Sequence, residues 1–165
     1  MALKSIGIVG CGAIGQALLQ ATDAGKLTVP VAGVTSRTEK SAREFLMTLR
    51  NPPPYLARAQ LIARSDLVVE AAGGSVVPVL AKEVFAAGKE LMIISVGALL
   101  DHPEIMAQAR EQGRRLFIPS GAIAGLDGIK SVCVGQVSHV TITTDRKSTR
   151  LNSSHIQKSR MPSSA

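Results

Sequence analysis

A glycine-rich hexapeptide near the N-terminus carries the clearest chemical meaning in the sequence. Residues 10–15, Gly-Cys-Gly-Ala-Ile-Gly, fit the pattern G-x-G-x-x-G between an apolar run, 5–9, and a segment of helical periodicity, 13–24. In this pattern the first glycine permits a tight turn, the second lets the backbone approach a pyrophosphate, and the third lets helix and strand pack closely. Amide groups at the helix N-terminus would hold the phosphates. The pattern therefore predicts dinucleotide binding through Gly10, Gly12, Ala13, Ile14 and Gly15.

A second polar group, Thr35-Ser36-Arg37, follows the next apolar run about 20 residues further on, as expected for a ribose contact. An Asp or Glu at that point would bind the ribose 2′-hydroxyl of NAD, whereas a hydroxyl beside a guanidinium suits the 2′-phosphate of NADP. We expect Ser36 and Arg37 to contact the ribose, with NADP accepted as well as NAD. Glu39 lies near enough to leave the preference open, and the alternative is that Arg37 is a solvated surface charge.

Three later segments are rich in glycine and hydroxyl groups where predicted strands end: 72–75, 95–99 and 119–127. Ligands of open parallel sheets bind outside the carboxyl ends of the strands, so these loops are expected at the nicotinamide end of the cofactor. Any one of them could instead be a compact connection. The residues expected to contact the cofactor here are Ala72, Gly73, Gly97, Ser120, Gly121 and Ala122.

Short apolar runs alternate with segments of helical length, which predicts the elements that position these loops. Near-continuous apolar strands separated by helices indicate a parallel sheet covered on both faces, an α/β fold of the Rossmann-type, doubly wound kind. The predicted strands are 5–9, 29–35, 66–71, 91–96 and 115–118. The predicted helices are 13–24, 38–49 with Thr38 as its cap, 58–63, 75–87, 103–112 and 127–134.

The C-terminal part changes character. Residues 137–144 alternate polar and apolar side chains, as in a strand buried on one face, which predicts the first strand of a truncated second α/β domain. Residues 145–165 contain six serines and four apolar residues without helical or strand periodicity. They resemble translated sequencing-adapter read-through, so we expect a non-native disordered tail, with a natural basic tail as the alternative. The predicted divisions are 1–135, 136–144 and 145–165.

Charge and composition exclude several classes of function. The net charge of +7 in 165 residues divides into +3 for residues 1–144 and +4 for the last 21. With one Tyr, three Phe and no Trp, the chain lacks the aromatic platform of single-strand binders, so no nucleic-acid role is expected. The uncharged stretch 5–22 contains four glycines, which argue against a membrane span. Cys11 and Cys133 show no metal-ligand spacing, so we expect no metal site and a reducing, cytoplasmic location.

Four segments together resemble the L-aspartate dehydrogenase family over about residues 4–144: the glycine hexapeptide, Asp66-Leu-Val-Val-Glu-Ala-Ala-Gly73, Ser95-Val-Gly-Ala-Leu99 and Pro119-Ser-Gly-Ala-Ile-Ala-Gly-Leu-Asp127. The resemblance implies an NAD(P)-dependent oxidoreductase that takes hydride from Cα of L-aspartate. The product, iminosuccinate, hydrolyses to oxaloacetate and ammonia or feeds NAD biosynthesis. The family pattern also implies that Ala122 contacts the cofactor and that the full-length enzyme could be a homodimer.

The resemblance stops short of the catalytic residues. In the family, a second domain supplies a further cofactor-binding Asn and the catalytic His, and His102, His139 and His155 match neither position. No catalytic residue is therefore assigned, and we expect this chain to bind NAD(P) weakly or not at all and not to oxidise L-aspartate. The alternatives are a non-catalytic dinucleotide-binding module and an enzyme like homoserine dehydrogenase or dihydrodipicolinate reductase.

Overall fold

The protein is described here by a computed structural model that covers residues 5–119 and two further strands, 140–146 and 155–161. The chain divides into two compact units, residues 1–121 and 122–165. The predicted helix 127–134 lies outside the described residues, and the predicted boundary after residue 135 stays a prediction.

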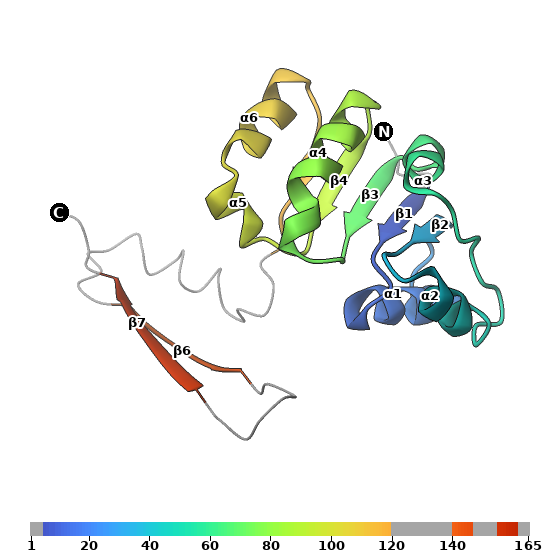
Figure 1. The fold of residues 1–165 in the computed structure, drawn as a ribbon, viewed down its shortest axis with the longest axis horizontal. Coiled ribbons are helices and arrows are strands. Elements are labelled where there is room, and N and C mark those ends of the chain that lie inside the picture. The colour runs from blue at the N-terminus through green and yellow to red at the C-terminus, as the bar shows by residue number, and fades with distance from the viewer. Residues whose placement is uncertain (1–4, 120–139, 147–154, 162–165) are drawn as a thin grey trace. The chain divides into compact units, whose positions relative to one another are not determined.

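The first unit is built on a five-stranded sheet in the order β2-β1-β3-β4-β5, and every paired strand is parallel. The chain leaves β1 in one direction and returns to β3 on the other side of it, which is the doubly wound arrangement that the sequence predicted (Figure 1). The strands are β1 (Ile6–Val9), β2 (Val31–Thr35), β3 (Leu67–Glu70), β4 (Glu90–Ile93) and β5 (Leu116–Phe117).

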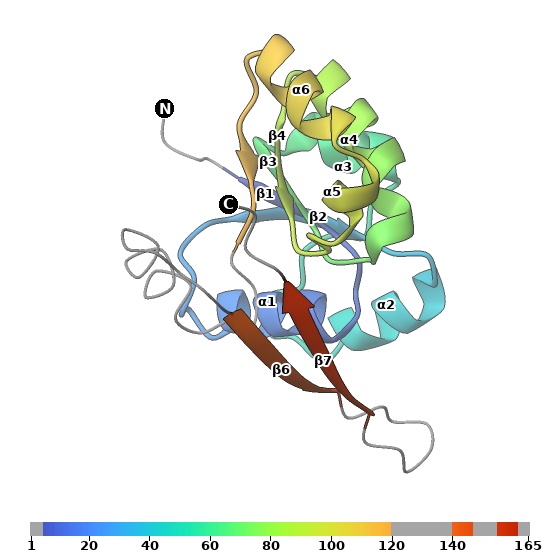
Figure 2. The ribbon, with the colours of Figure 1, turned by 90° about the vertical axis from the view of Figure 1, so that its left-hand side faces the viewer.

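Helices cover both faces of this sheet. The helices are α1 (Ala13–Asp23), α2 (Glu39–Leu46), α3 (Arg58–Arg64), α4 (Val77–Ala86), α5 (Ala98–Asp101) and α6 (Glu104–Glu111), with a 3₁₀ turn, η1 (Gly74–Val76), before α4. Figure 2 shows α4, α5 and α6 on one side of the sheet. Leu61 of α3, Leu80 of α4 and Ile105 of α6 share a buried cluster with Val9 and Val68. Leu19 of α1 and Leu46 of α2 pack in a separate cluster with Ile8 and Val34. Neighbouring residues of β1 thus enter different clusters, as strand alternation requires.

One more strand position, a single residue long, lies beside β2. Tyr55 forms an isolated parallel bridge with Val34. The Val34 amide donates to the Pro54 carbonyl at 3.0 Å, and the Leu56 amide donates to the Val34 carbonyl at 2.9 Å. With this bridge counted as a strand, the order becomes 3-2-1-4-5-6, that of the dinucleotide-binding Rossmann fold. The sequence indicated only a helix stop at the prolines of this segment.

Element ends differ from the predictions by a few residues. The second predicted helix ends at Leu46 rather than Leu49, and Thr38 occupies its N-cap position without a side-chain hydrogen bond to the helix. The short helix α5 was not predicted, because its four residues follow directly on a strand exit and offer no helical periodicity. No helix among the described residues, α1 in the uncharged stretch included, is long and apolar enough to span a membrane.

The second unit contains a two-stranded antiparallel sheet. Strand β6 (Val140–Arg146) pairs with β7 (His155–Met161) from Val140 opposite Met161 to Arg146 opposite His155. The prediction of a strand near 137–144 is confirmed for 140–144. Strand β7 lies within residues 145–165, where the sequence shows no helical or strand periodicity, and the non-native origin of this tail stays a prediction. Strand pairing uses backbone amides and carbonyls, so a serine-rich segment can pair without side-chain alternation.

Candidate functional site

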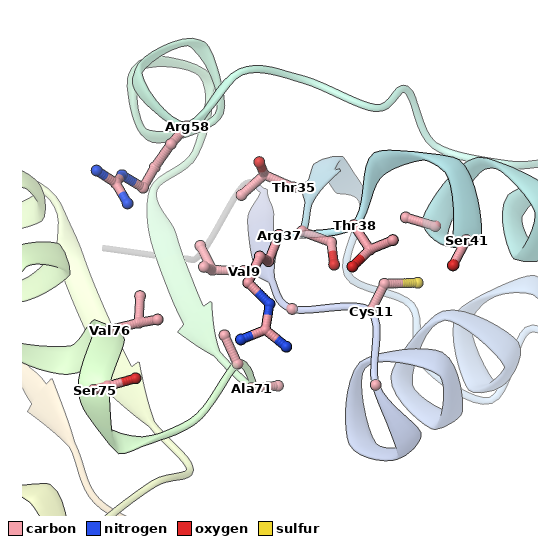
Figure 3. A pocket seen from close by; sticks show the side chains of 15 residues that line it. Val9, Cys11, Thr35, Arg37, Thr38, Ser41, Arg58, Ala71, Ser75 and Val76 are labelled. Carbon is pink, nitrogen blue, oxygen red and sulfur yellow. The ribbon is translucent and has the colours of Figure 1, made fainter.

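A pocket of about 560 Å³ opens at the carboxyl ends of β1, β2 and β3 (Figure 3). This is the point where the strand order reverses, and ligands of doubly wound sheets bind there. The residues that line the pocket are Val9, Gly10, Cys11, Gly12, Thr35, Ser36, Arg37, Thr38, Ser41, Ala42, Arg58, Ala71, Ala72, Ser75 and Val76.

Each of the three glycines of the hexapeptide has its own local geometry. Gly10 has φ +108°, a conformation that side chains disfavour, and a Cβ atom there would collide with the carbonyl oxygen of Ala71. Gly15 is buried, and a Cβ atom there would collide with the Gly10 carbonyl oxygen, so α1 packs closely on the turn. Gly12 is exposed, and nothing lies within 4 Å of the position its Cβ would take. The backbone at Gly12 is therefore open to a ligand.

The N-terminus of α1 suits an anion. Among the described residues, no side chain caps this helix, and its first turn, which includes Ala13 and Ile14, carries no acidic residue. The first amides of a helix have no partner within the helix, and the helix dipole favours negative charge beside them. Open space above Gly12 next to an uncapped helix start fits a diphosphate, so the residues present fit a dinucleotide cofactor.

The end of β2 provides the cationic part of the pocket. Arg37 lines the pocket and extends towards Ala71 on its other side (Figure 3). The lining residues, all within the described part of the chain, include no Asp or Glu. Glu39 is not among them, and its carboxylate pairs with Arg43 on the same helix at 2.7 Å. Glu39, which left the preference between NAD and NADP open in the sequence, therefore forms its ion pair outside the pocket.

Arg58 is a second cation of the pocket that the sequence analysis did not identify. It begins α3, and its guanidinium pairs with Glu83 of α4, with Nε 2.7 Å and Nη2 2.8 Å from the two carboxylate oxygens. The chain reaches α3 through the one-residue strand at Tyr55, and Arg58 lines the pocket from the start of this helix. Its position after a proline-rich segment gave no local signal for such a role.

Ser36 is held in place by the phenol of Tyr55. The Tyr55 hydroxyl donates a hydrogen bond of 2.8 Å to the Ser36 carbonyl, and the Ser36 amide donates to the Tyr55 hydroxyl oxygen at 3.4 Å. The guanidinium of Arg43 lies 4.9 Å from the centroid of the Tyr55 ring. Tyr55 thereby fixes the backbone next to Arg37, a contact that local sequence patterns did not indicate.

The loops after β3 and β4 are held by a buried carboxylate. Glu70, fully buried at the end of β3, accepts hydrogen bonds from the amides of Ala72, Gly73 and Ser95 at 2.7, 2.8 and 2.9 Å. The Ser95 hydroxyl adds a fourth at 3.1 Å. The sequence pattern indicated only that Glu70 is part of a strand.

The predicted site residues divide into three groups. Gly10, Gly12, Ser36, Arg37 and Ala72 line the pocket. Described residues that do not line it are Ala13, Ile14, Gly15, Gly73 and Gly97. Ser120, Gly121 and Ala122 lie outside the described residues, so their contact with a cofactor stays a prediction.

Cys11 is a free thiol in the wall of the pocket. Its partial burial raises the pKa of the thiol, since removal from water disfavours the thiolate. The side chain is therefore in its neutral form at neutral pH, next to the place where a diphosphate would lie. The described residues contain no group of three His, Cys, Asp or Glu side chains able to hold a metal ion.

The curated relatives to which the chain is similar are named L-aspartate dehydrogenase. The chain is 35% identical over 146 residues to the L-aspartate dehydrogenase of Methanosarcina acetivorans, covering 86% of this chain and 54% of that protein. It is 37% identical over 142 residues to that of Methanocella arvoryzae, covering 84% and 53%. The resemblance to L-aspartate dehydrogenases is thereby confirmed. The chain spans about half the length of these relatives.

Solved structures confirm the fold. A homoserine dehydrogenase from Thiobacillus denitrificans matches with a TM-score of 0.60 at 21% identity, covering 77% of this chain and 32% of that one. A UDP-N-acetylglucosamine 3-dehydrogenase from Acidithiobacillus ferrooxidans matches with a TM-score of 0.67 at 18% identity, covering 89% and 49%.

The comparison with family profiles agrees with the geometry of the glycine turn. Residues 10–119 match the family described as "Homoserine dehydrogenase, NAD binding domain", a stretch that runs from the first glycine of the turn to the end of the described sheet. This chain belongs to that family of NAD-binding domains.

Proposed function

We propose that the pocket binds NADP(H) in preference to NAD(H). The observation that carries this proposal is Arg37, which follows β2 and lines the pocket. The lining residues, all within the described part of the chain, include no carboxylate, and the second lining cation, Arg58, is paired with Glu83. A guanidinium forms strong, charge-assisted hydrogen bonds with a phosphate, whereas the ribose 2′-hydroxyl of NAD is usually held by a carboxylate at this position. The hydroxyl groups of Ser36, Thr38 and Ser41 add further donors.

The whole protein is proposed to be an L-aspartate dehydrogenase. The names of the relatives and the glycine turn support this assignment. The cofactor, when bound, accepts hydride from Cα of the amino acid. The backbone at Gly12 would hold its diphosphate, Arg37 its ribose phosphate, and the loops after β3 and β4 would support its nicotinamide end. A cytoplasmic location follows from this proposal, because the enzyme would draw on the cellular pools of NAD(P) and aspartate.

Calorimetric titration of residues 1–165 with NADP+ and NAD+ at millimolar concentration tests the cofactor proposal. We expect NADP+ to bind more tightly, and Arg37→Ala to weaken NADP+ binding about tenfold, the loss expected for a charge-assisted contact. Binding of NAD+ should change less than about twofold, because NAD+ has no 2′-phosphate to lose that contact. Arg110→Ala, on α6 and outside the pocket, is the matched control. Equal losses for both dinucleotides would contradict the assignment of Arg37.

A chimera tests the enzyme proposal. Residues 1–144 would be joined to the C-terminal half of the Methanosarcina acetivorans relative, which supplies the part that this chain does not match. We expect L-aspartate-dependent reduction of NADP+ by the chimera and none by residues 1–165 alone. A folded chimera that binds NADP+ without oxidising L-aspartate would contradict the proposal. Oxidation of homoserine in place of L-aspartate would favour the activity named in the family description.

A further inference from the structure

Glu70 is the one charged side chain among the fully buried residues of the described core. It ends β3, the strand between β1 and β4, with Val9 opposite it on one side and Ile93 on the other. Taking a carboxylate out of water costs several kcal/mol unless good hydrogen bonds replace the lost water. An apolar side chain of the same size would fill this position of the core without that desolvation cost. The presence of a carboxylate here therefore requires a reason other than packing.

The hydrogen bonds of Glu70 join two loops. Oε1 accepts from the amides of Ala72 and Gly73, in the loop after β3, and from the Ser95 hydroxyl, in the loop after β4. Oε2 accepts from the Ser95 amide. Both carboxylate oxygens therefore accept hydrogen bonds from the loops, and Oε1 bonds to both of them. The contribution of the carboxylate is mechanical: it fixes the distance between the two loops.

The loop after β3 packs directly against the glycine turn. The Ala71 amide donates to the Val9 carbonyl at 2.8 Å, and the Ala71 carbonyl oxygen occupies the position that a Cβ of Gly10 would need. Ala71 and Ala72 both line the pocket. The two residues that follow Ala71 are held by Glu70, so the carboxylate sets how closely the wall of the pocket approaches the turn.

The second loop begins at Ser95 and leads into α5. It follows β4, so it lies at the same edge of the parallel sheet but further from β2, away from the ribose end of the pocket. In the proposed function this loop supports the nicotinamide end. A link between the loops after β3 and β4 therefore sets the spacing of the two loops that would support the nicotinamide end.

We infer that Glu70 is a positioning residue that holds these two loops in the spacing required by a complete dinucleotide. This inference rests on the proposed function. It implies that loss of the carboxylate weakens binding of the whole dinucleotide more than binding of its adenosine half, because the half-ligand needs only the turn and the end of β2.

Glu70→Gln tests the inference without changing the size of the side chain. A carboxamide has one oxygen and one NH₂ group, so one of the two loops meets an N–H where it previously met an oxygen. Titration of the full 165-residue chain with NADP+ and with adenosine 2′,5′-bisphosphate, at a temperature where circular dichroism shows both proteins folded, gives the two affinities. We expect NADP+ affinity to fall about tenfold and bisphosphate affinity to change less than about twofold.

Two more variants complete the test. Ser65→Ala is the matched control, since Ser65 is buried at the other end of β3 and its hydroxyl donates to the Leu61 carbonyl at 2.7 Å. It should lower thermal stability and leave both affinities unchanged. Ser95→Ala removes only the hydroxyl bond to Glu70, so it should weaken NADP+ binding about threefold. This variant carries the test if Glu70→Gln does not fold.

The outcomes separate this inference from the proposed function. If the unaltered chain binds neither probe at millimolar concentration, the proposed binding of NADP(H) by this pocket fails and the inference fails with it. If the unaltered chain binds both probes and the Glu70 and Ser95 variants retain its ratio of affinities, the inference alone is overturned. Equal weakening of both probes, or the same loss in Ser65→Ala, would also overturn it, because that result describes general destabilisation.

Discussion

The hydroxyl of Tyr55 donates a 2.8 Å hydrogen bond to the carbonyl of Ser36, nineteen residues earlier in the chain. Tyr55 forms the isolated bridge to Val34 on the outer side of β2, and Ser36 is the first residue after β2. The contact therefore holds the point where the chain turns from the sheet into the cationic wall of the pocket.

Replacement of Tyr55 by Phe should affect both stability and binding. Loss of the hydroxyl leaves the Ser36 carbonyl without this donor, so we expect the free energy of unfolding to fall by about 0.5–1.5 kcal/mol. NADP+ affinity should fall a few-fold, because Arg37 follows directly on the residue that is released. Urea denaturation and calorimetric titration measure the two effects.

Thr48→Val provides the control for Tyr55→Phe. The Thr48 hydroxyl donates to the Phe45 carbonyl at 2.7 Å just after α2, and Thr48 does not line the pocket. This variant should lose stability without losing affinity. An unchanged NADP+ affinity in Tyr55→Phe would show that the phenol supports the fold but not the site.

Gly12 and Gly15 should respond to substitution in opposite ways. A side chain at Gly12 enters open space, so Gly12→Val should fold with a loss of no more than about 1 kcal/mol, while its methyl groups block the approach of a diphosphate. Dinucleotide binding should fall below detection. At Gly15 even one methyl group meets the Gly10 carbonyl, so Gly15→Ala should cost about 1–3 kcal/mol of stability, as overpacking does.

Thermal denaturation and titration with NADP+ distinguish these two glycines. The roles assigned to them would be refuted by a Gly12→Val protein that binds NADP+ normally, or by a Gly15→Ala protein as stable as the parent chain.

Asp23 should make stability depend on pH in the acid range. Its carboxylate accepts hydrogen bonds from the amides of Asn51, at 2.8 Å, and Arg50, at 3.1 Å, and so ties the end of α1 to the segment after α2. These bonds, that from Asn51 first, lower the pKa of Asp23 in the folded state. A lowered pKa stabilises the fold above the unfolded pKa of about 3.9, and the stabilisation disappears as the pH falls through the folded value.

Comparison with Asp23→Asn isolates this contribution. The parent chain should have the higher melting temperature at pH 7, and the difference should shrink below about pH 4, where the unfolded carboxyl takes up its proton. Melting curves followed by circular dichroism between pH 7 and pH 2.5 measure it. A difference that stays constant over this range would mean that the charge of Asp23 contributes nothing.

The parts of the fold that the sequence predicted well are those with a strong local signal. Four-residue buried strands such as Leu67–Glu70 appear as apolar runs, and α1 begins at Ala13 as predicted. Predicted ends were less accurate where capping residues were ambiguous, as at Leu46. The pairing of His155–Met161 with β6 gave no side-chain pattern to detect.

What the sequence alone determined is the strand, glycine turn and helix of residues 6–23, because the positive φ of Gly10 and the close approach of Gly15 to the Gly10 carbonyl arise within a few residues of the chain. Only the tertiary structure decided that Arg58 lines the pocket and that Tyr55 and Glu70 hold the segments that form its walls. Tyr55 and Glu70 form hydrogen bonds with partners 19 and 25 residues away in the chain. Arg58 reaches the pocket because the chain passes along the outer side of β2, at Tyr55, before α3 begins. Such contacts depend on which strands become neighbours in the sheet, and no local spacing of residue types specifies that.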